Sequence, residues 1–281
     1  MTVHIVTDST ADLDAGFRQE HDVAMVPLKV IFGEEEFTDY VDLQPAAFYK
    51  RMRESSVHPR TSQPTPVDFE DVFRAVGSDG APIVCTTISS EMSGTYASAR
   101  QARASLHDLD IRVVDTRSVG PGHNALAHVA IAAAQRGADA DGVVAAVVKA
   151  MESLRLLFTV ETLEYLKRGG RIGGAAALVG TMLNIKPVLE VRDGRVEPMD
   201  RVRTYARALE RLVDEAVAAA REWGGASVYV GHADSPDLAD TLRARLEAEP
   251  NTTVEVSWVG PVIGSHSGPG AFGIAYHRLL G

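Results

Sequence analysis

At 281 residues the chain lies near the usual upper limit for one hydrophobic core, so we expect two domains with a cleft between them. The formal net charge of −10 argues against a protein that binds the phosphate backbone of nucleic acids, because that affinity rests on clustered Lys and Arg. Cys85 is the one cysteine, which excludes an internal disulfide and a CxxC metal site, and its place in "PIVCTTI" predicts a small buried side chain.

The start of the chain, "MTVHIVTDST", turns polar within a few residues and lacks the apolar region of a secretory signal. The longest apolar stretches, 143–151 and 175–183, are shorter than the roughly 20 residues that span a bilayer. We therefore expect a cytoplasmic protein without stable membrane insertion.

The first half of the chain alternates apolar strands with helices. Strands are predicted over 3–8, 23–32, 37–43, 82–89 and 111–116, and helices from about residue 11, over 45–55, after Pro66, and over 93–106, 121–137 and 141–154. Strands that are apolar on both faces indicate a mainly parallel sheet covered by helices on both sides. Because ligands bind beyond the carboxyl ends of such strands, the hydroxyl-rich segments 8–10, 89–95 and 115–122 are expected along the rim of a site.

The second half has a different character. The pattern predicts a strand and a helix that ends at Gly169 and Gly170, a short apolar helix over 175–184, and a hairpin with its turn at Asp193-Gly194. A helix over 205–224, a strand over 226–234, a helix over 236–249, a strand over 253–264 and a glycine-rich loop around His266 follow. The prediction is an α/β protein with an N-terminal domain over 1–149, built on a mainly parallel sheet flanked by helices, and a C-terminal mixed α/β domain over 150–281.

Ser93 and His266 raise the possibility of a serine hydrolase, since a nucleophile needs a base within hydrogen-bond reach. The sequence around the serine reads Glu91-Met92-Ser93-Gly94-Thr95, which does not match the G-x-S-x-G nucleophile elbow. Ser93 could instead cap the following helix or form a hydrogen bond with a ligand. The three alternatives stay open from these residues alone.

Other common sites lack their sequence signatures. There is no H-E-x-x-H motif, and His123 and His128 are five residues apart, so no metal site is predicted. The glycines of "RGGRIGG" and "GPGAFG" match neither the P-loop nor the dinucleotide-binding pattern. The basic run "KRGGR", with Arg201 and Arg203 further on, is either a solvated face or a docking surface for an acidic partner or a phosphorylated product.

Several segments taken together resemble the DegV family of bacterial fatty-acid-binding proteins, which serve as the lipid-carrying subunit of fatty acid kinase. These segments are "VTDSTADL", "TSQPTP", "SSEMSGTYASA", "FTVETLEYLKRGGRIGGAAALVGTMLNIKPVLEV", "VGHAD" and "GPVIGSHSGPGAFGIAYH". Their order and spacing carry the resemblance, which spans nearly the whole chain. It implies two α/β domains with an acyl chain buried between them and no cofactor besides that ligand.

The resemblance also implies roles for individual residues. Thr61 of "TSQPTP", Ser93 of "SGTY" and His266 of "GSHSGPG" would hold the fatty acid carboxylate. Three arginines would meet the kinase or the acyl-phosphate, namely Arg171, Arg201 and Arg203. The chain departs from the usual family pattern at Pro121 and Gly122, which stand where a serine-and-methionine-like helix start is more usual.

The function implied is a non-catalytic carrier that presents the carboxylate of a long-chain fatty acid to a separate ATP-dependent kinase. The acyl-phosphate would then pass to an acyltransferase in lipid synthesis. The alternatives are an acyl-ester or thioester hydrolase that uses Ser93 and His266, and a lipid sensor that regulates another protein.

Overall fold

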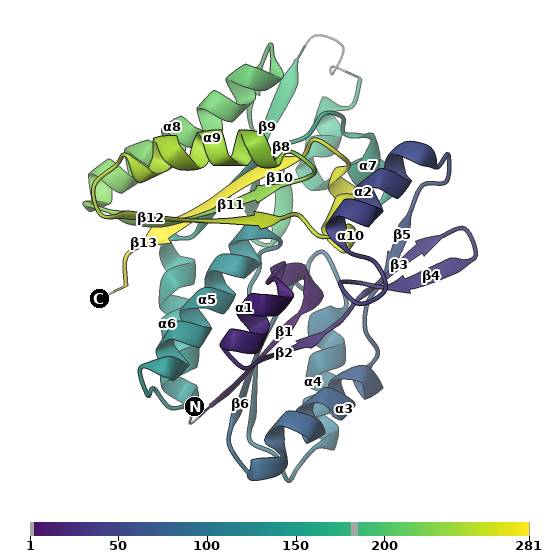
Figure 1. Cartoon of the computed structure of the whole chain (residues 1–281), viewed down its shortest axis with the longest axis vertical. Helices are drawn as coiled ribbons and strands as arrows, with labels where there is room; N and C mark the ends of the chain where they lie inside the picture. Colours follow the sequence, from purple (N-terminus) through teal and green to yellow (C-terminus); the bar gives the residue numbers. More distant parts are fainter. Residues whose placement is uncertain (1–2, 181–184, 281) are drawn as a thin grey trace.

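The computed structural model describes residues 3–180 and 185–280, and Figure 1 shows the arrangement of its elements. The N-terminal sheet has the strand order β2 (Val23–Val26), β1 (His4–Asp8), β6 (Ile83–Thr87) and β7 (Ile111–Asp115), and all its neighbouring strands are parallel. One face of this sheet packs on α3 (Pro66–Val76) and α4 (Thr95–Ser105), and the other on α5 (Pro121–Gln135) and α6 (Ala140–Ser153). The predicted parallel sheet with helices on both sides is confirmed.

The burial of the strands explains this layering. Val6, Cys85 and Ile111 point to the face covered by α3 and α4, whereas Ile5 and Val84 point to the face covered by α5 and α6. Neighbouring residues of a strand point to opposite faces, so a strand that is apolar throughout needs cover on both sides. Cys85 is fully buried and unpaired, as the sequence predicts, and burial raises the pKa of its thiol well above the usual value.

The C-terminal sheet is mixed, in the order β10 (Arg195–Val202), β9 (Lys186–Arg192), β8 (Arg155–Thr159), β13 (Phe272–Arg278), β11 (Ala226–His232) and β12 (Thr252–Trp258). The β11–β12 pair is parallel, and the other described pairs are antiparallel. α8 (Tyr205–Trp223) and α9 (Pro236–Glu247) cover its outer face, and α5 and α6 lie on its inner face (Figure 1). α5 and α6 therefore form a layer shared by the two sheets.

A small third sheet lies beside these layers, in the order β4 (Glu35–Thr38), β3 (Lys29–Phe32) and β5 (Arg60–Ser62). It packs with α2 (Pro45–Glu54), α7 (Glu164–Arg168), the 3₁₀ helix Gly173–Leu178 and α10 (Pro261–Ser267) in one apolar cluster. The shorter elements α1 (Ala15–Glu20) and the 3₁₀ helices Ser9–Ala11 and Gly77–Asp79 border the parallel sheet. No helix of the described ranges is long and apolar enough to cross a membrane.

Several local predictions need correction. The predicted strand over 37–43 ends at Thr38 in β4, and the predicted strand over 253–264 ends at Trp258 in β12. The predicted strand over 23–32 is two strands in different sheets, because Pro27 has no N–H to continue a ladder between β2 and β3. Thr61 lies in β5, where the sequence pattern predicts no strand. His266 lies in the last turn of α10 rather than in a glycine-rich loop, since Pro261 at the first helical position and Gly264 at the contact with Phe48 allow a short helix to pack there.

Two other predictions concern connections. The hairpin turn is confirmed, with positive φ at Asp193 (52°) and Gly194 (81°), as a two-residue type I′ turn requires. The predicted helix over 175–184 overlaps the 3₁₀ helix Gly173–Leu178, and its residues 181–184 lie outside the described residues. The predicted domain limits at 149 and 150 lie inside α6, so the division into 1–149 and 150–281 stays a prediction.

The start of α5 packs closely on two paired strands of the mixed sheet. Gly231 on β11 pairs with Gly273 on β13, and both face the ring of Pro121. A Cβ on Gly231 would lie 2.4 Å from Cγ of Pro121, which is closer than van der Waals contact permits. The glycine at 231 therefore lets the proline ring approach the sheet.

We predict that Gly231→Ala lowers the free energy of unfolding by about 1–3 kcal/mol, the usual cost of overpacking a core. Urea unfolding followed by circular dichroism measures it. The double variant Gly231→Ala with Pro121→Ala removes the ring atoms that cause the collision and should recover part of the loss. Equal stability of Gly231→Ala and the wild-type chain would contradict this account of the packing.

Candidate lipid site between the two sheets

A cavity of about 390 Å³ lies where the two sheets, α5 and α10 meet. Its wall is mostly apolar and is formed from both halves of the chain, including Leu28, Ile88, Leu156, Phe158, Val191 and Val262. Polar side chains join this wall from β5, from the loop before α4 and from α10, namely Thr61, Ser93 and His266. The cavity is amphiphilic, since its wall is mostly apolar but also carries neutral hydrogen-bonding groups.

Thr61 and His266 are hydrogen-bonded across 205 positions of sequence, with 2.8 Å between Thr61 Oγ1 and His266 Nε2. The other ring nitrogen, Nδ1, has no hydrogen-bond partner among the described residues and faces Gly169, where a Cβ would lie 2.0 Å away. When Nε2 carries the proton, it donates to Thr61 and leaves the threonine hydroxyl free to donate to a ligand. In this tautomer the Thr61 hydroxyl hydrogen is available for a hydrogen-bond acceptor in the cavity.

The imidazole of His266 is neutral at pH 7. Burial, the positive charge of Arg171 and the nearby ring of His58 together lower the pKa of His266 to about 4, with burial the largest cause. The polar part of the cavity therefore offers hydrogen bonds from an uncharged ring and from hydroxyl groups. Arg171, which also lines the cavity, places a positive charge near these groups.

Ser93 lies two residues before the start of α4 at Thr95 and directly precedes the N-cap, Gly94. The serine Oγ is 2.8 Å from Thr95 Oγ1 and accepts a weak hydrogen bond from the Thr95 N–H at 3.3 Å. The N-cap residue is therefore Gly94 rather than Ser93, while the Ser93 hydroxyl accepts from the N–H of the first residue of α4. The dyad required by a hydrolase is also not formed, because His266 Nε2 contacts Thr61 while Ser93 contacts Thr95.

The loop that carries Ser93 is held by the turn of the β9–β10 hairpin. Ser89 Oγ donates to the Gly194 carbonyl at 2.7 Å, and the Arg195 guanidinium donates to Glu91 at 2.8 and 2.5 Å. From the other side, Arg171 Nε donates to the Met92 carbonyl at 3.0 Å. Sequence reasoning missed this arrangement, because the Asp193-Gly194 signal predicts a turn but not the loop on which it docks.

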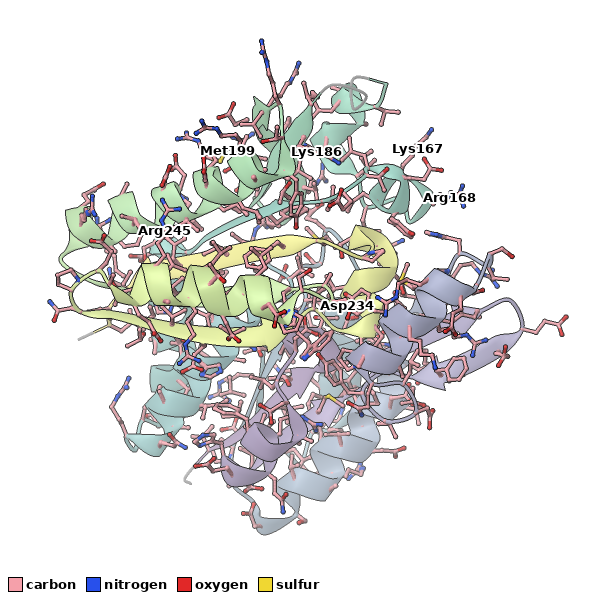
Figure 2. The ribbon with its side chains drawn as sticks, turned by 45° about the horizontal axis from the view of Figure 1, so that its top comes forward. Lys167, Arg168, Lys186, Met199, Asp234 and Arg245 are labelled. Atoms are coloured by element: carbon pink, nitrogen blue, oxygen red, sulfur yellow. The ribbon has the colours of Figure 1, made fainter. Side chains whose placement is uncertain are left out.

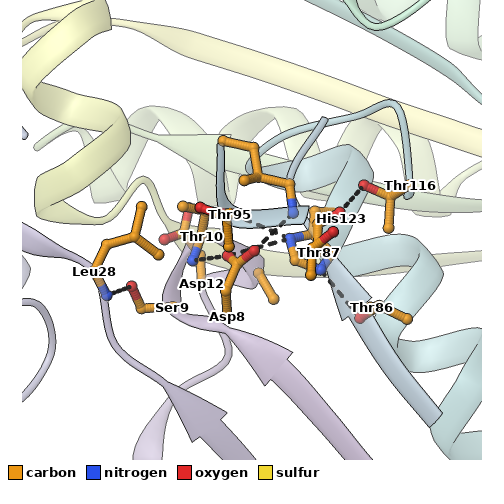
Figure 3. A network of polar contacts seen from close by, with 12 residues as sticks. Asp8, Ser9, Thr10, Asp12, Leu28, Thr86, Thr87, Thr95, Thr116 and His123 are labelled. Carbon is orange, nitrogen blue, oxygen red and sulfur yellow. Dashed lines mark hydrogen bonds and ion pairs between the residues drawn. The ribbon is translucent and has the colours of Figure 1, made fainter. Parts of the chain in front are cut away.

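Behind the site, the ends of β1 and β6 form a buried polar network (Figure 3). The carboxylate of Asp8 accepts from Thr10 N at 2.9 Å, Thr10 Oγ1 at 2.6 Å and Ile88 N at 2.7 Å. His123 bridges the network, with Nδ1 3.2 Å from Thr10 Oγ1 and Nε2 3.1 Å from Thr86 Oγ1. Asp8, Thr10 and Thr86 are buried and do not line the cavity, so the predicted rim of hydroxyls is divided between a structural network and the site.

A second buried acid connects this network to α10. Asp12 accepts hydrogen bonds from Tyr40 Oη at 3.0 Å and from the Gly260 N–H at 3.1 Å. Burial and the nearby carboxyl of Asp39 raise the pKa of Asp12 well above its usual value, and burial raises the pKa of Asp39 to about 8. Because Gly260 is the N-cap of α10, these contacts help to fix the helix that carries His266.

The three arginines named from the resemblance are not brought together. Arg171 lines the cavity, whereas Arg201 and Arg203 are exposed at and beyond the end of β10, outside its wall. Figure 2 shows Lys167 and Arg168 pointing outward from the end of α7, where Arg168 also pairs with Glu164 at 2.7 Å. No group of three metal-ligating side chains occurs within 3–180 and 185–280.

Comparison with known proteins agrees with this architecture. The model of the family described as uncharacterised protein, DegV family, matches residues 2–279. A DegV domain-containing protein of Clostridium acetobutylicum is 36% identical over 285 residues, covering 99% of this chain and 98% of that protein.

Solved structures are similar over the same length. A DegV family protein from Thermus thermophilus, described as fatty acid binding, has 34% identity and a TM-score of 0.92, covering 99% of this chain and 100% of its own. DegV from Bacillus subtilis, described as a fatty acid binding protein, has 28% identity and the same TM-score of 0.92, with the same coverage of both chains. The predicted family and fold class are confirmed, and the chain belongs to the DegV family.

Proposed function

We propose that the chain binds a long-chain fatty acid, with the acyl chain along the apolar wall of the cavity and the carboxylate at Thr61, Ser93 and His266. The observation that carries this proposal is the amphiphilic cavity, where these three side chains join a wall formed mainly by apolar residues. Fatty acid binding by the structural neighbours from Thermus thermophilus and Bacillus subtilis supports it.

The head group and the tail make different contributions. Burial of a carboxylate without partners is costly, and donors directed at its oxygens offset that cost. Burial of the tail contributes about 0.8 kcal/mol per CH₂, or about 11 kcal/mol for about 14 methylenes before immobilisation costs. Affinity then comes mainly from the tail, and position comes from the head.

The proposal extends to presentation of the carboxylate to a separate ATP-dependent kinase in the cytoplasm, with an acyltransferase as the later acceptor of the acyl group. Neutral donors suit this role, because Thr61 and His266 hold an anion without the strong ion pair that a buried lysine would form. Arg171 is positioned at the same cavity, where its positive charge would favour a phosphorylated head group. Arg201 and Arg203, being exposed, would contact the kinase rather than the ligand.

The direct test is mass spectrometry of the protein purified from a bacterial host, first intact under native conditions and then after organic extraction. A mass increment near one ligand per chain that resolves into free fatty acids is expected. The proposal would be overturned if the purified protein contained no fatty acid and also bound neither added palmitate nor added oleate.

We predict that Thr61→Val and Ser93→Ala each weaken palmitate binding by about 10- to 100-fold, because each removes a hydrogen bond to a charged group worth about 1.5–3 kcal/mol. Titration calorimetry on delipidated protein measures the affinity. Thr241→Val, at an exposed position of α9, is the matched control and should bind as the wild-type chain does. Unchanged affinity in both cavity variants would exclude them as carboxylate ligands.

We predict that the ring of His266 titrates near pH 4 in the empty protein and at a higher pH when palmitate is bound, because an adjacent carboxylate favours the protonated ring. Histidine NMR resonances followed against pH, with His266→Gln for assignment, report both values. The pKa of His266 is lower in the folded than in the unfolded chain, so its contribution to stability is complete above about pH 6.5 and declines as the pH falls towards 4.

The exposed His107 serves as the control for this titration, since it lies on the loop after α4 and away from the cavity. A His266 resonance whose midpoint does not move when palmitate is added would show that the carboxylate lies elsewhere. Urea unfolding of His266→Gln should also lose stability less steeply than the wild-type chain between pH 6.5 and 4.

A further inference from the structure

Gly273 lies in the interior of a buried strand, and its backbone conformation does not require glycine. It lies on β13 between Phe158 of β8 and Gly231 of β11, and its φ is outside the left-handed region. Glycine within a strand costs backbone entropy and leaves no side chain to pack. Such a position often marks a place where another group approaches the strand closely.

Packing does not require glycine at 273 either. A Cβ there would lie 3.5 Å from Phe158 Cβ, 3.5 Å from Pro121 Cγ and 3.6 Å from the Leu157 carbonyl oxygen, all ordinary van der Waals distances. The paired Gly231 is different, because its Cβ would collide with Pro121 at 2.4 Å. Alanine fits at 273 and does not fit at 231.

Gly273 faces the inside of the cavity. Phe272 and Ile274 belong to the cluster under α8 and α9, so Gly273, on the opposite face of β13, points towards the start of α5. It lines the cavity together with Pro121 and Phe158, an apolar part of the wall formed by β8, β13 and α5. The polar groups come from other elements, since Thr61 lies on β5, Ser93 before α4 and His266 on α10.

We propose that Gly273 sets the length of acyl chain that the cavity accepts. Because it has no side chain, it leaves space at the wall of the mixed sheet for the methyl end of the ligand. This inference rests on the proposed binding of a fatty acid. A side chain at 273 would occupy space beside Pro121 and Phe158, and the protein would then favour shorter saturated acids.

The test is a competition among laurate, myristate, palmitate and stearate in equal amounts. Delipidated wild-type protein and the variants Gly273→Ala and Gly273→Val take up the mixture, and the bound acids are quantified after extraction. The stearate-to-myristate ratio should fall in Gly273→Ala and fall further in Gly273→Val, by about tenfold, since a few methylenes in a closed pocket discriminate on that scale.

Gly142→Ala on α6, away from the cavity, is the matched control and should retain the wild-type ratio. The melting temperature of each variant checks folding, and Gly273→Ala, which meets only ordinary contacts, carries the test if the valine variant does not fold. If the wild-type chain takes up the acids and Gly273→Ala either shows the same ratio or loses all four acids equally, the inference alone is overturned. A wild-type protein that takes up none of the four acids overturns the proposed function and the inference together.

Discussion

The cavity depends on one constraint of packing, which is that two sheets share a single layer of helices. α5 and α6 bury apolar side chains against the parallel sheet on one side and the mixed sheet on the other. The sheets are therefore held apart by a full helix layer, roughly 10–12 Å thick with its side chains, and lie further apart than sheets that pack directly on each other. Where α5 begins, at Gly120 and Pro121, the helix layer ends and the space between the sheets is left open. The cavity occupies that space, so its apolar wall is a direct consequence of the layering.

The polar part of the cavity is built on elements that are fixed from outside the helix layer. Thr61 is held by pairing of β5 with β3, and His266 by α10, whose N-cap amide donates to the buried Asp12. Ser93 depends on the hairpin turn that contacts Ser89 and Glu91. These contacts come from distant parts of the chain, so the donors are placed before any ligand arrives. Such preorganisation reduces the entropy lost on binding, which is what the proposed binding of a carboxylate by uncharged groups requires.

The layers were predictable because they follow from short-range patterns. The strand β6 reads as a continuous apolar run, and the turn at Asp193-Gly194 has the residues that positive φ demands. The helix around His266 was missed because its glycines indicate a loop, whereas Gly264 is needed for the close approach of Phe48. The bond between Thr61 and His266 also lies beyond local reasoning, since their spacing of 205 residues carries no geometric information. The resemblance to a family, and not the periodicity of the sequence, predicted that Thr61 and His266 act together.

The paired glycines on β11 and β13 show why residue type alone is a weak guide to role. Gly231 and Gly273 are cross-strand neighbours on one face of the sheet, and both lie near Pro121. At 231 the ring fills the space that a side chain would need, so the glycine serves the packing of α5. At 273 the space is open to the cavity, and a methyl group would meet no collision. Alanine at such a position ordinarily increases stability, because it loses no contact and restricts the conformations of the unfolded chain. Glycine at 273, beside an apolar cavity, therefore fits the proposal of a wall shaped for a ligand better than a requirement of the fold.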